Sequence, residues 1–285
     1  TATTEIYTLS LHDALPICGS ARDGADEIDQ VTGILNGTTN YILTKMDQEE
    51  TSFEDALKEA QDNGFAERKP EADVEGFDAC RKIAILSSIV LEKFVNFEDI
   101  QTEGITKITT ADFQYARKLG WAIKLLGSSW KENGRVYAMV APALVKPENP
   151  LFAVNDVFNA ILVHGNMVDN VMFYGRGAGS HATASAVMAD VVEAAKNLHQ
   201  NIYAGWTAEK QELSGISTSR KQFLIRVKGD ASRKSELVEK FGSGQLIDAG
   251  VAGEIGYLTP VISEKEFDEA AAGMEGILHR IRVQA

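Results

Sequence analysis

The chain has 285 residues, 44% of them hydrophobic and 24% charged, which is typical of a folded protein with room for two modest domains. Its 41 acidic and 28 basic residues give a net charge of −13, which repels a phosphate backbone and argues against nucleic acid as a partner. The two cysteines, Cys18 and Cys80, are too few for a disulfide framework and belong to no metal-binding motif. We therefore expect a cytoplasmic protein, and we predict no metal site.

The first 17 residues have an unusual character. They contain no Lys or Arg, which argues against a signal peptide, and they show no helical or strand period. The chain starts with Thr rather than Met. We therefore expect residues 1–17 to be a leader foreign to the fold, at the start of an N-terminally truncated sequence. No apolar run in the chain approaches the roughly 18 residues that a membrane span requires, so no membrane partner is expected.

The next part of the chain predicts a strand, a polar turn and two helices. Apolar residues between 28 and 35 indicate the strand, the polar turn covers residues 36–40, and a helix restarts at Tyr41. A second helix is predicted over residues 53–63. Ser52 is its candidate N-cap, and Gly64 suits the left-handed position at its end.

The middle of the chain predicts helices beside a mostly open sheet. Helices are expected at about 74–90 and 110–126, from apolar residues at helical spacing. Strands are then expected at 135–141, 160–164 and 170–174, before a glycine-rich turn and a helix over about 183–198. The pattern indicates a mixed α/β (α+β) fold.

A polar stretch at 207–220 predicts a domain boundary before a terminal unit of about 65 residues. Within that unit the pattern predicts strand, helix, two strands, helix and strand. This is the split β-α-β order of ferredoxin-like domains. The predicted elements are residues 223–227, 234–241, 245–249, 256–261, 264–274 and 279–283.

The most informative chemistry lies in residues 64–83, where several carboxylates precede an apolar helix. Asp78 and Lys82 are four residues apart, so they share a helix face that continues to Ile85 and Ile89. A lysine beside apolar surface with a carboxylate one turn away can serve as an acid or a base. An exposed i,i+4 ion pair, worth a few tenths of a kcal/mol, is the structural alternative. Spacing alone favours the exposed pair, because such pairs are frequent on helices.

Two segments resemble the signature regions of homoserine dehydrogenases, in the same order and at the same separation. They are residues 33–43 (GILNGTTNYIL) and residues 73–79 (DVEGFDA) followed by Lys82. Later blocks at 142–145, 150–152, 157–160 and 173–179, with Thr183 and Ala184, also resemble that family. The resemblance spans roughly residues 28–195. It implies NADP- or NAD-dependent interconversion of L-homoserine and L-aspartate 4-semialdehyde, on the route to threonine, methionine and isoleucine.

The resemblance also implies roles for individual residues. Lys82 would be the catalytic acid/base, with Asp78 beside it. Glu67 and Asp73 would bind the amino-acid end of the substrate, where a primary ammonium favours carboxylates. The other substrate-site residues would be Gly37, Thr38 and Phe65, the last of which stands where the family often has a tyrosine.

The glycine-rich turn is the candidate cofactor contact. Its N–H groups, with those of the helix that follows, could face an anion. The resemblance implies that Gly175, Gly177, Gly179 and Thr183 contact the nicotinamide cofactor, whereas the spacing alone fits an ordinary tight turn. The chain lacks a Gly-x-Gly-x-x-Gly fingerprint, so we expect most of the Rossmann domain to be absent. Residues 18–206 would form the catalytic and substrate domain, with 175–200 returning to the nucleotide-binding domain.

The terminal unit, residues 214–285, resembles the ACT domains that often end this family. Such a domain implies a homo-oligomer, a dimer or tetramer, and a possible amino-acid effector such as threonine. Its loop at 229–232 departs from the usual ACT turn, so pairing through sheet edges is the more direct structural expectation. The alternative hypothesis for the whole chain is a non-catalytic regulatory protein that keeps the first domain only as a dimerisation surface.

Overall fold

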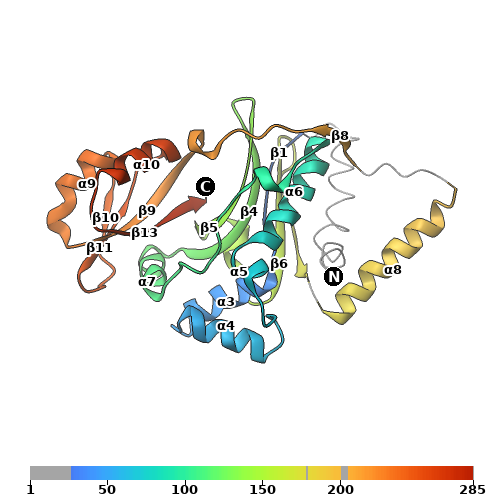
Figure 1. The fold of residues 1–285 in the computed structure, drawn as a ribbon, viewed down its shortest axis with the longest axis horizontal. Coiled ribbons are helices and arrows are strands. Elements are labelled where there is room, and N and C mark those ends of the chain that lie inside the picture. The colour runs from blue at the N-terminus through green and yellow to red at the C-terminus, as the bar shows by residue number, and fades with distance from the viewer. Residues whose placement is uncertain (1–26, 178, 200–204, 285) are drawn as a thin grey trace.

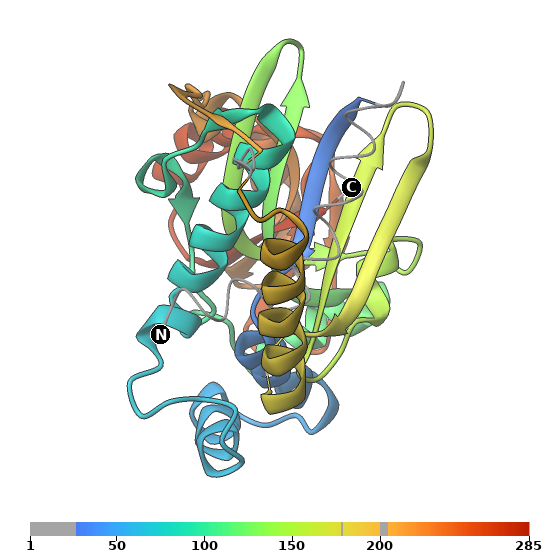
Figure 2. The ribbon, with the colours of Figure 1, turned by 90° about the vertical axis from the view of Figure 1, so that its right-hand side faces the viewer.

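The fold is built on one large, mostly antiparallel sheet. The computed structural model describes residues 27–177, 179–199 and 205–284, so the predicted leader and Cys18 lie outside the described residues. The first part of the sheet contains β1 (Ile28–Ile34), β4 (Ala122–Glu132), β5 (Arg135–Val145), β6 (Phe158–Gly165) and β7 (Asp169–Arg176), in the order β5-β4-β1-β6-β7. In Figure 2 the blue β1 lies between the green β4–β5 hairpin and the yellow β6–β7 hairpin. The predicted open sheet with helices beside it is confirmed.

Both faces of the central strands are covered, which explains their nearly continuous burial. On one face lies α6 (Phe77–Leu91), whose Ile83, Leu86 and Ile89 are buried in the main core. Each such side chain contributes about 2 kcal/mol through burial of its apolar surface. On the other face, Leu151 and Val154 from the short segment after β5 pack with Leu126 and Leu162 of the strands.

The first helix begins earlier than predicted. Helix α3 (Gly37–Gln48) starts directly after β1, because the Asn36 side chain accepts a hydrogen bond from the Thr39 N–H and caps the helix. Helix α4 (Phe53–Asp62) agrees with its prediction. Ser52 caps it, and Gly64 has a φ of +75°.

Two predicted helices are wrong in extent, and glycine explains both errors. The helix expected at about 74–90 is α6, which starts only at Phe77 because Gly76 has a φ of +80°, and Val74 instead ends the short helix α5 (Glu71–Val74). The helix expected at 110–126 is α7 (Thr110–Leu119), which ends at Gly120 with a φ of +72°. Residues 122–126 belong to β4 and pair with β5.

The terminal unit has the predicted order of elements. It contains β9 (Arg220–Lys228), α9 (Lys234–Phe241), β10 (Gln245–Ile247), β11 (Glu254–Leu258), α10 (Glu264–Ala272) and β13 (Ile277–Gln284), with strand order β10-β11-β9-β13. The short β12 (Ile262–Ser263) also pairs with β9. A separate apolar cluster that includes Phe223, Tyr257 and Phe267 lies under its two helices. This order and pairing are ferredoxin-like.

The terminal unit joins the body through backbone pairing. Strand β13 lies parallel to β5, with Arg282, Val283 and Gln284 opposite residues 143–145, so one sheet runs through both parts (Figure 1). The linking stretch contributes β8 (Thr207–Lys210), which pairs with β2 (Lys93–Phe94), while β3 (Gln101–Thr102) pairs with β5. The β13 edge of the terminal sheet is therefore already used within the chain.

Buried ion pairs reinforce this junction. Arg226 of β9 bonds Asp112 of α7 at 2.8 Å and Glu254 of β11 at 2.9 Å, and His279 lies 2.9 Å from the same Asp112. Asp112 is fully buried. The N–H and hydroxyl of Thr109 also donate to Asp112 in a capping box. Asp112 therefore serves both the start of α7 and the docking of the terminal unit.

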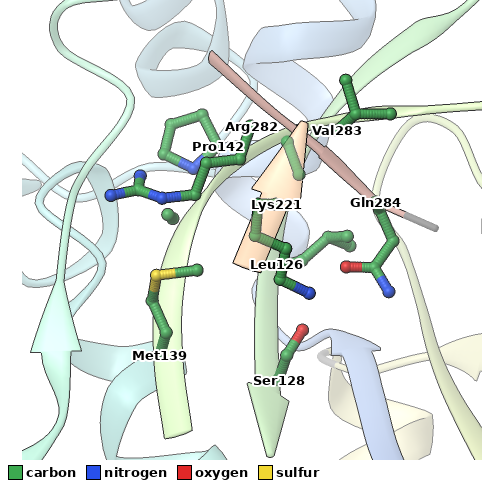
Figure 3. A pocket seen from close by; sticks show the side chains of 10 residues that line it. Leu126, Ser128, Met139, Pro142, Lys221, Arg282, Val283 and Gln284 are labelled. Atoms are coloured by element: carbon green, nitrogen blue, oxygen red, sulfur yellow. The ribbon is translucent and has the colours of Figure 1, made fainter. Parts of the chain in front are cut away.

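A second cluster surrounds Arg282, which contacts both Glu264 and Glu103. Burial by itself would raise the pKa of the Glu103 carboxyl, but the hydrogen bond and charge of Arg282, with Arg280, lower that pKa to about 2. Figure 3 shows Arg282 with Lys221, Met139 and Pro142 around a junction cavity of about 10 Å³, which is room for about one water molecule.

Helix α8 (Ser180–Lys196) lies apart from the sheet, at the right of Figure 1. Of its residues only Ala186 is buried, and Val187, Met188, Val191 and Val192 are exposed. None of the helices in the described ranges is both long and apolar enough to cross a membrane.

We predict that Asp112→Ala destabilises the protein by about 3 to 5 kcal/mol, because it leaves Arg226 buried with one partner fewer. Urea unfolding followed by circular dichroism measures this. The control is Lys265→Ala, which removes an exposed pair with Glu269 and should change stability by less than about 0.5 kcal/mol. Equal effects of the two substitutions would contradict the structural role of Asp112.

The low pKa of Glu103 predicts a pH dependence. Because the folded-state pKa lies below the ordinary value of 4.5, the stabilisation is fully present above pH 4.5 and is lost as the pH falls toward 2. The difference in free energy of unfolding between wild type and Glu103→Gln should therefore shrink over that window. Urea unfolding at successive pH values tests it, and a constant difference would refute it.

Candidate functional site

The predicted acid/base pair lies in the first half of α6, where Lys82 is buried and Asp78 is partly buried. Lys82 is 5% exposed, and its Nζ lies 2.8 Å from Oδ2 of Asp78. The same Nζ donates to the backbone carbonyl of Leu35 at 3.0 Å. An ammonium group has three donors, and two of them have partners within the described residues, while the third has none there. The exposed-pair alternative is wrong for this pair.

Asn36 links this pair to the other carboxylate of the site. Its Nδ2 donates to Oδ1 of Asp73 at 2.7 Å and to Oδ2 of Asp78 at 2.9 Å. Its Oδ1 is used to cap α3. The amide therefore holds two carboxylates from α5 and α6 beside the first turn of a third helix. This role of Asn36 was not predicted from the sequence, although an Asn ahead of Gly-Thr-Thr is a recognisable N-cap signal.

The loop before α5 is attached to the same helix. The Thr38 hydroxyl donates to the backbone carbonyl of Phe65 at 2.6 Å, and the Phe65 ring lies 4.9 Å from the Tyr41 ring. Phe65 and Glu67 are both exposed. In the part of the chain that the structure describes, the Glu67 carboxylate makes no hydrogen bond or ion pair. The structure thus brings Gly37, Thr38, Asp73, Asp78 and Lys82 together and leaves Glu67 at the rim.

The glycine-rich turn leads into a helix, as the sequence predicts, although α8 starts at Ser180 rather than near Thr183. Gly175 pairs with Asn159, one residue before the β6–β7 pairing ends at Arg176. Gly179 has a φ of +117°, and a Cβ there would meet nothing within 4 Å. Thr183 lies one turn into α8, where its N–H bonds the Gly179 carbonyl. The turn therefore offers open backbone at a helix N-terminus. Ala178 lies outside the described residues.

Lys124 is a second buried lysine, and it was not predicted from the sequence, which favours a helix over residues 122–126. Its Nζ donates to the Val154 carbonyl and, at 2.8 Å, to Oδ1 of Asn155. Burial lowers the pKa of Lys124 to about 8, against an opposing effect of nearby Asp47. Its contacts hold the segment that lies under Gly37, where a Cβ would come within 2.8 Å of the Val157 carbonyl.

Comparisons with known proteins agree on one family. The family model for homoserine dehydrogenase matches residues 16–192. The homoserine dehydrogenase of Bacillus subtilis is 40% identical over 242 residues, which cover 82% of this chain and 56% of the relative. The structure is similar to the solved homoserine dehydrogenase of Thiobacillus denitrificans, with a TM-score of 0.84, 33% identity, and coverage of 94% of this chain and 67% of that one.

A hyperthermophilic archaeal homoserine dehydrogenase mutant, solved in complex with NADPH, is more distant. It has a TM-score of 0.51 and 28% identity, over 66% of this chain and 54% of that one. The chain spans about half the length of the curated relatives that it matches.

The double role of Asn36 predicts an unusually costly substitution. Asn36→Ala removes a cap worth about 1 kcal/mol and two hydrogen bonds to charged groups, each worth about 1.5 to 3 kcal/mol. The matched control is Ser52→Ala, which removes the cap of α4 together with an exposed hydrogen bond to the Asp55 carboxylate, and which should cost about 1 kcal/mol. Urea unfolding measures both changes, and equal losses would show that the bonds to Asp73 and Asp78 contribute nothing.

Proposed function

The chain belongs to the homoserine dehydrogenase family, and we propose that it carries the substrate-binding and acid/base half of an enzyme that interconverts L-homoserine and L-aspartate 4-semialdehyde with NADP or NAD. The observation that carries this proposal is the buried Lys82, which pairs with Asp78 and is linked to Asp73 through Asn36. A purely regulatory protein has no need of a buried ammonium group whose third donor has no partner within the described residues. The regulatory alternative is therefore not favoured.

In the proposed reaction the substrate hydroxyl loses its proton as the carbon beside it loses hydride. Lys82 would accept that proton in the oxidative direction and return it to the aldehyde oxygen in the reductive direction. Asp78 and the Leu35 carbonyl would orient Nζ, since each accepts one of its N–H groups. Burial of Lys82 limits the access of water to its Nζ, which strengthens these interactions.

The carboxylates would recognise the amino-acid end of the substrate. We assign Asp73 and Glu67 to its ammonium group, because charge-assisted hydrogen bonds of this kind are strong. Asp73 is held in place by Asn36, whereas Glu67 lies on the exposed loop tied to Thr38 through Phe65.

The turn before α8 has features that fit a dinucleotide. Gly179 leaves open space beside its backbone, the first N–H groups of α8 have no partner in their own helix, and the buried Oδ1 of Asn159 has no hydrogen-bond partner in the described structure. We assign Gly175, Gly177, Gly179 and Thr183 to this contact. When bound, the nicotinamide cofactor takes up or supplies the hydride. The archaeal relative in complex with NADPH supports this class of cofactor.

The two remaining parts of the chain are assigned by their surfaces and topology. We infer that the exposed apolar residues of α8 pack on a nucleotide-binding domain, because an isolated apolar helix face is unfavourable in water. We assign the terminal unit, with its ferredoxin-like strand order, to the ACT type, with threonine as candidate effector. Pairing between copies in a homo-oligomer would use its β10 edge, since β13 pairs with β5.

The experiment is NADP-dependent oxidation of L-homoserine by a full-length protein that carries this chain together with its nucleotide-binding domain. We expect Lys82→Ala to lower kcat about 10²- to 10⁴-fold while L-homoserine still binds, as calorimetry would measure. The matched control is Lys93→Ala, an exposed lysine just beyond the end of α6, which should keep wild-type activity. Lack of activity in the wild type would refute the proposed function.

A further inference from the structure

Asn159 lies at the boundary between the two halves of the proposed site. It is near the start of β6, is 4% exposed and pairs with Gly175 of β7. Its Oδ1 is buried and has no hydrogen-bond partner within the described residues. A buried amide oxygen without a donor is unfavourable, so another arrangement of the surrounding backbone, in which this oxygen gains a donor, would relieve that cost.

The backbone at two glycines lies close to the Asn159 side-chain amide. A Cβ at Gly177 would come within 2.0 Å of the Asn159 Nδ2 atom, and a Cβ at Gly37 would come within 3.3 Å of its Oδ1. Only glycine allows the backbone at 177 to approach so closely. The amide is therefore in contact range of the backbone of both segments, and a shift of one segment changes the space available to the other.

The two glycines lie in the parts of the site that we assign to different ligands. Gly37 follows Asn36, which holds Asp73 and Asp78 on the substrate side. Gly177 is part of the turn assigned to the cofactor and is itself buried. The contacts thus run from Lys82 through Asp78, Asn36 and Gly37 to Asn159, and from there to Gly177.

We propose that Asn159 is a positioning residue that couples cofactor binding to substrate binding, by setting the positions of Gly177 and Gly37 together. This inference rests on the proposed function. Cofactor binding fixes the backbone at Gly177 and thereby the Asn159 amide, which presents Gly37 and the carboxylates beside it in the geometry that holds the substrate. By thermodynamic linkage, the substrate tightens cofactor binding by the same factor.

The test is an equilibrium titration of the full-length protein with NADPH, followed by nicotinamide fluorescence, with and without saturating L-homoserine. These two ligands are both reduced and do not react with each other. We expect L-homoserine to lower the Kd of wild type for NADPH by at least about fivefold, the lower end of usual coupling. In Asn159→Ala the ratio of the NADPH Kd without L-homoserine to that with it should fall to near 1. A merely structural role would weaken the binding of both ligands and leave this ratio unchanged.

Two further variants keep the test decisive. Asn159→Thr retains a polar, strand-compatible side chain that is too short to reach both glycines. This variant should fold, and its ratio of Kd values should also fall to near 1. Asn170→Ala, on the partner strand of the same hairpin and bonded to His164, should keep the wild-type ratio. A wild-type ratio near 1, or a wild-type ratio in both Asn159 variants, would overturn the inference. Absence of NADPH binding and of activity in the wild type would instead overturn the proposed function, and this inference with it.

Discussion

The amide of Asn36 holds the site together. One end of this side chain begins helix α3, and the other end bonds carboxylates that arrive from α5 and α6. Two negative groups that close would repel each other if they had no donor between them. The same amide that satisfies them also fixes the direction of the helix that carries the neighbouring substrate-site residues. At Asn36 the start of a helix and the placement of two carboxylates therefore depend on the same side chain.

At the junction with the terminal unit, one side chain again has two structural roles. Asp112 completes the capping box of α7, and it also receives Arg226 and His279 from the terminal sheet. The strand β3 and the loop that follows it connect this junction to the site, because the N–H of Ile105 bonds the Val74 carbonyl at the end of α5. Helix α5, which carries Asp73, is thus hydrogen-bonded to the loop after β3, and Arg282 of the terminal unit binds Glu103 at the start of that loop.

Features with short-range signals could be predicted from the sequence. Ser52 and Gly64 delimit α4, the six elements of the terminal unit occur in the predicted order, and the spacing of Asp78 and Lys82 places them together. The helix at 110–126 failed because Ile123 fits helical spacing as well as strand alternation, and only pairing with β5 decides between them. Burial of Lys82 and the contacts of Lys124 depend on segments distant in sequence, so no local pattern reveals them.

The parallel pairing of β13 with β5 has a consequence for biosynthesis. Strand β13 follows every other described element, and its partner lies in the middle of the chain. Domains generally fold as units during synthesis, with the earlier part first. Residues 143–145 of β5, which β3 does not cover, therefore stay unpaired on that edge until residues 282–284 leave the ribosome, and an unpaired strand edge is a template for pairing with other chains. A chaperone that covers this edge, or a low growth temperature, should therefore increase the yield of folded protein. The increase should be larger than for a protein whose sheet pairs only strands that are close in sequence.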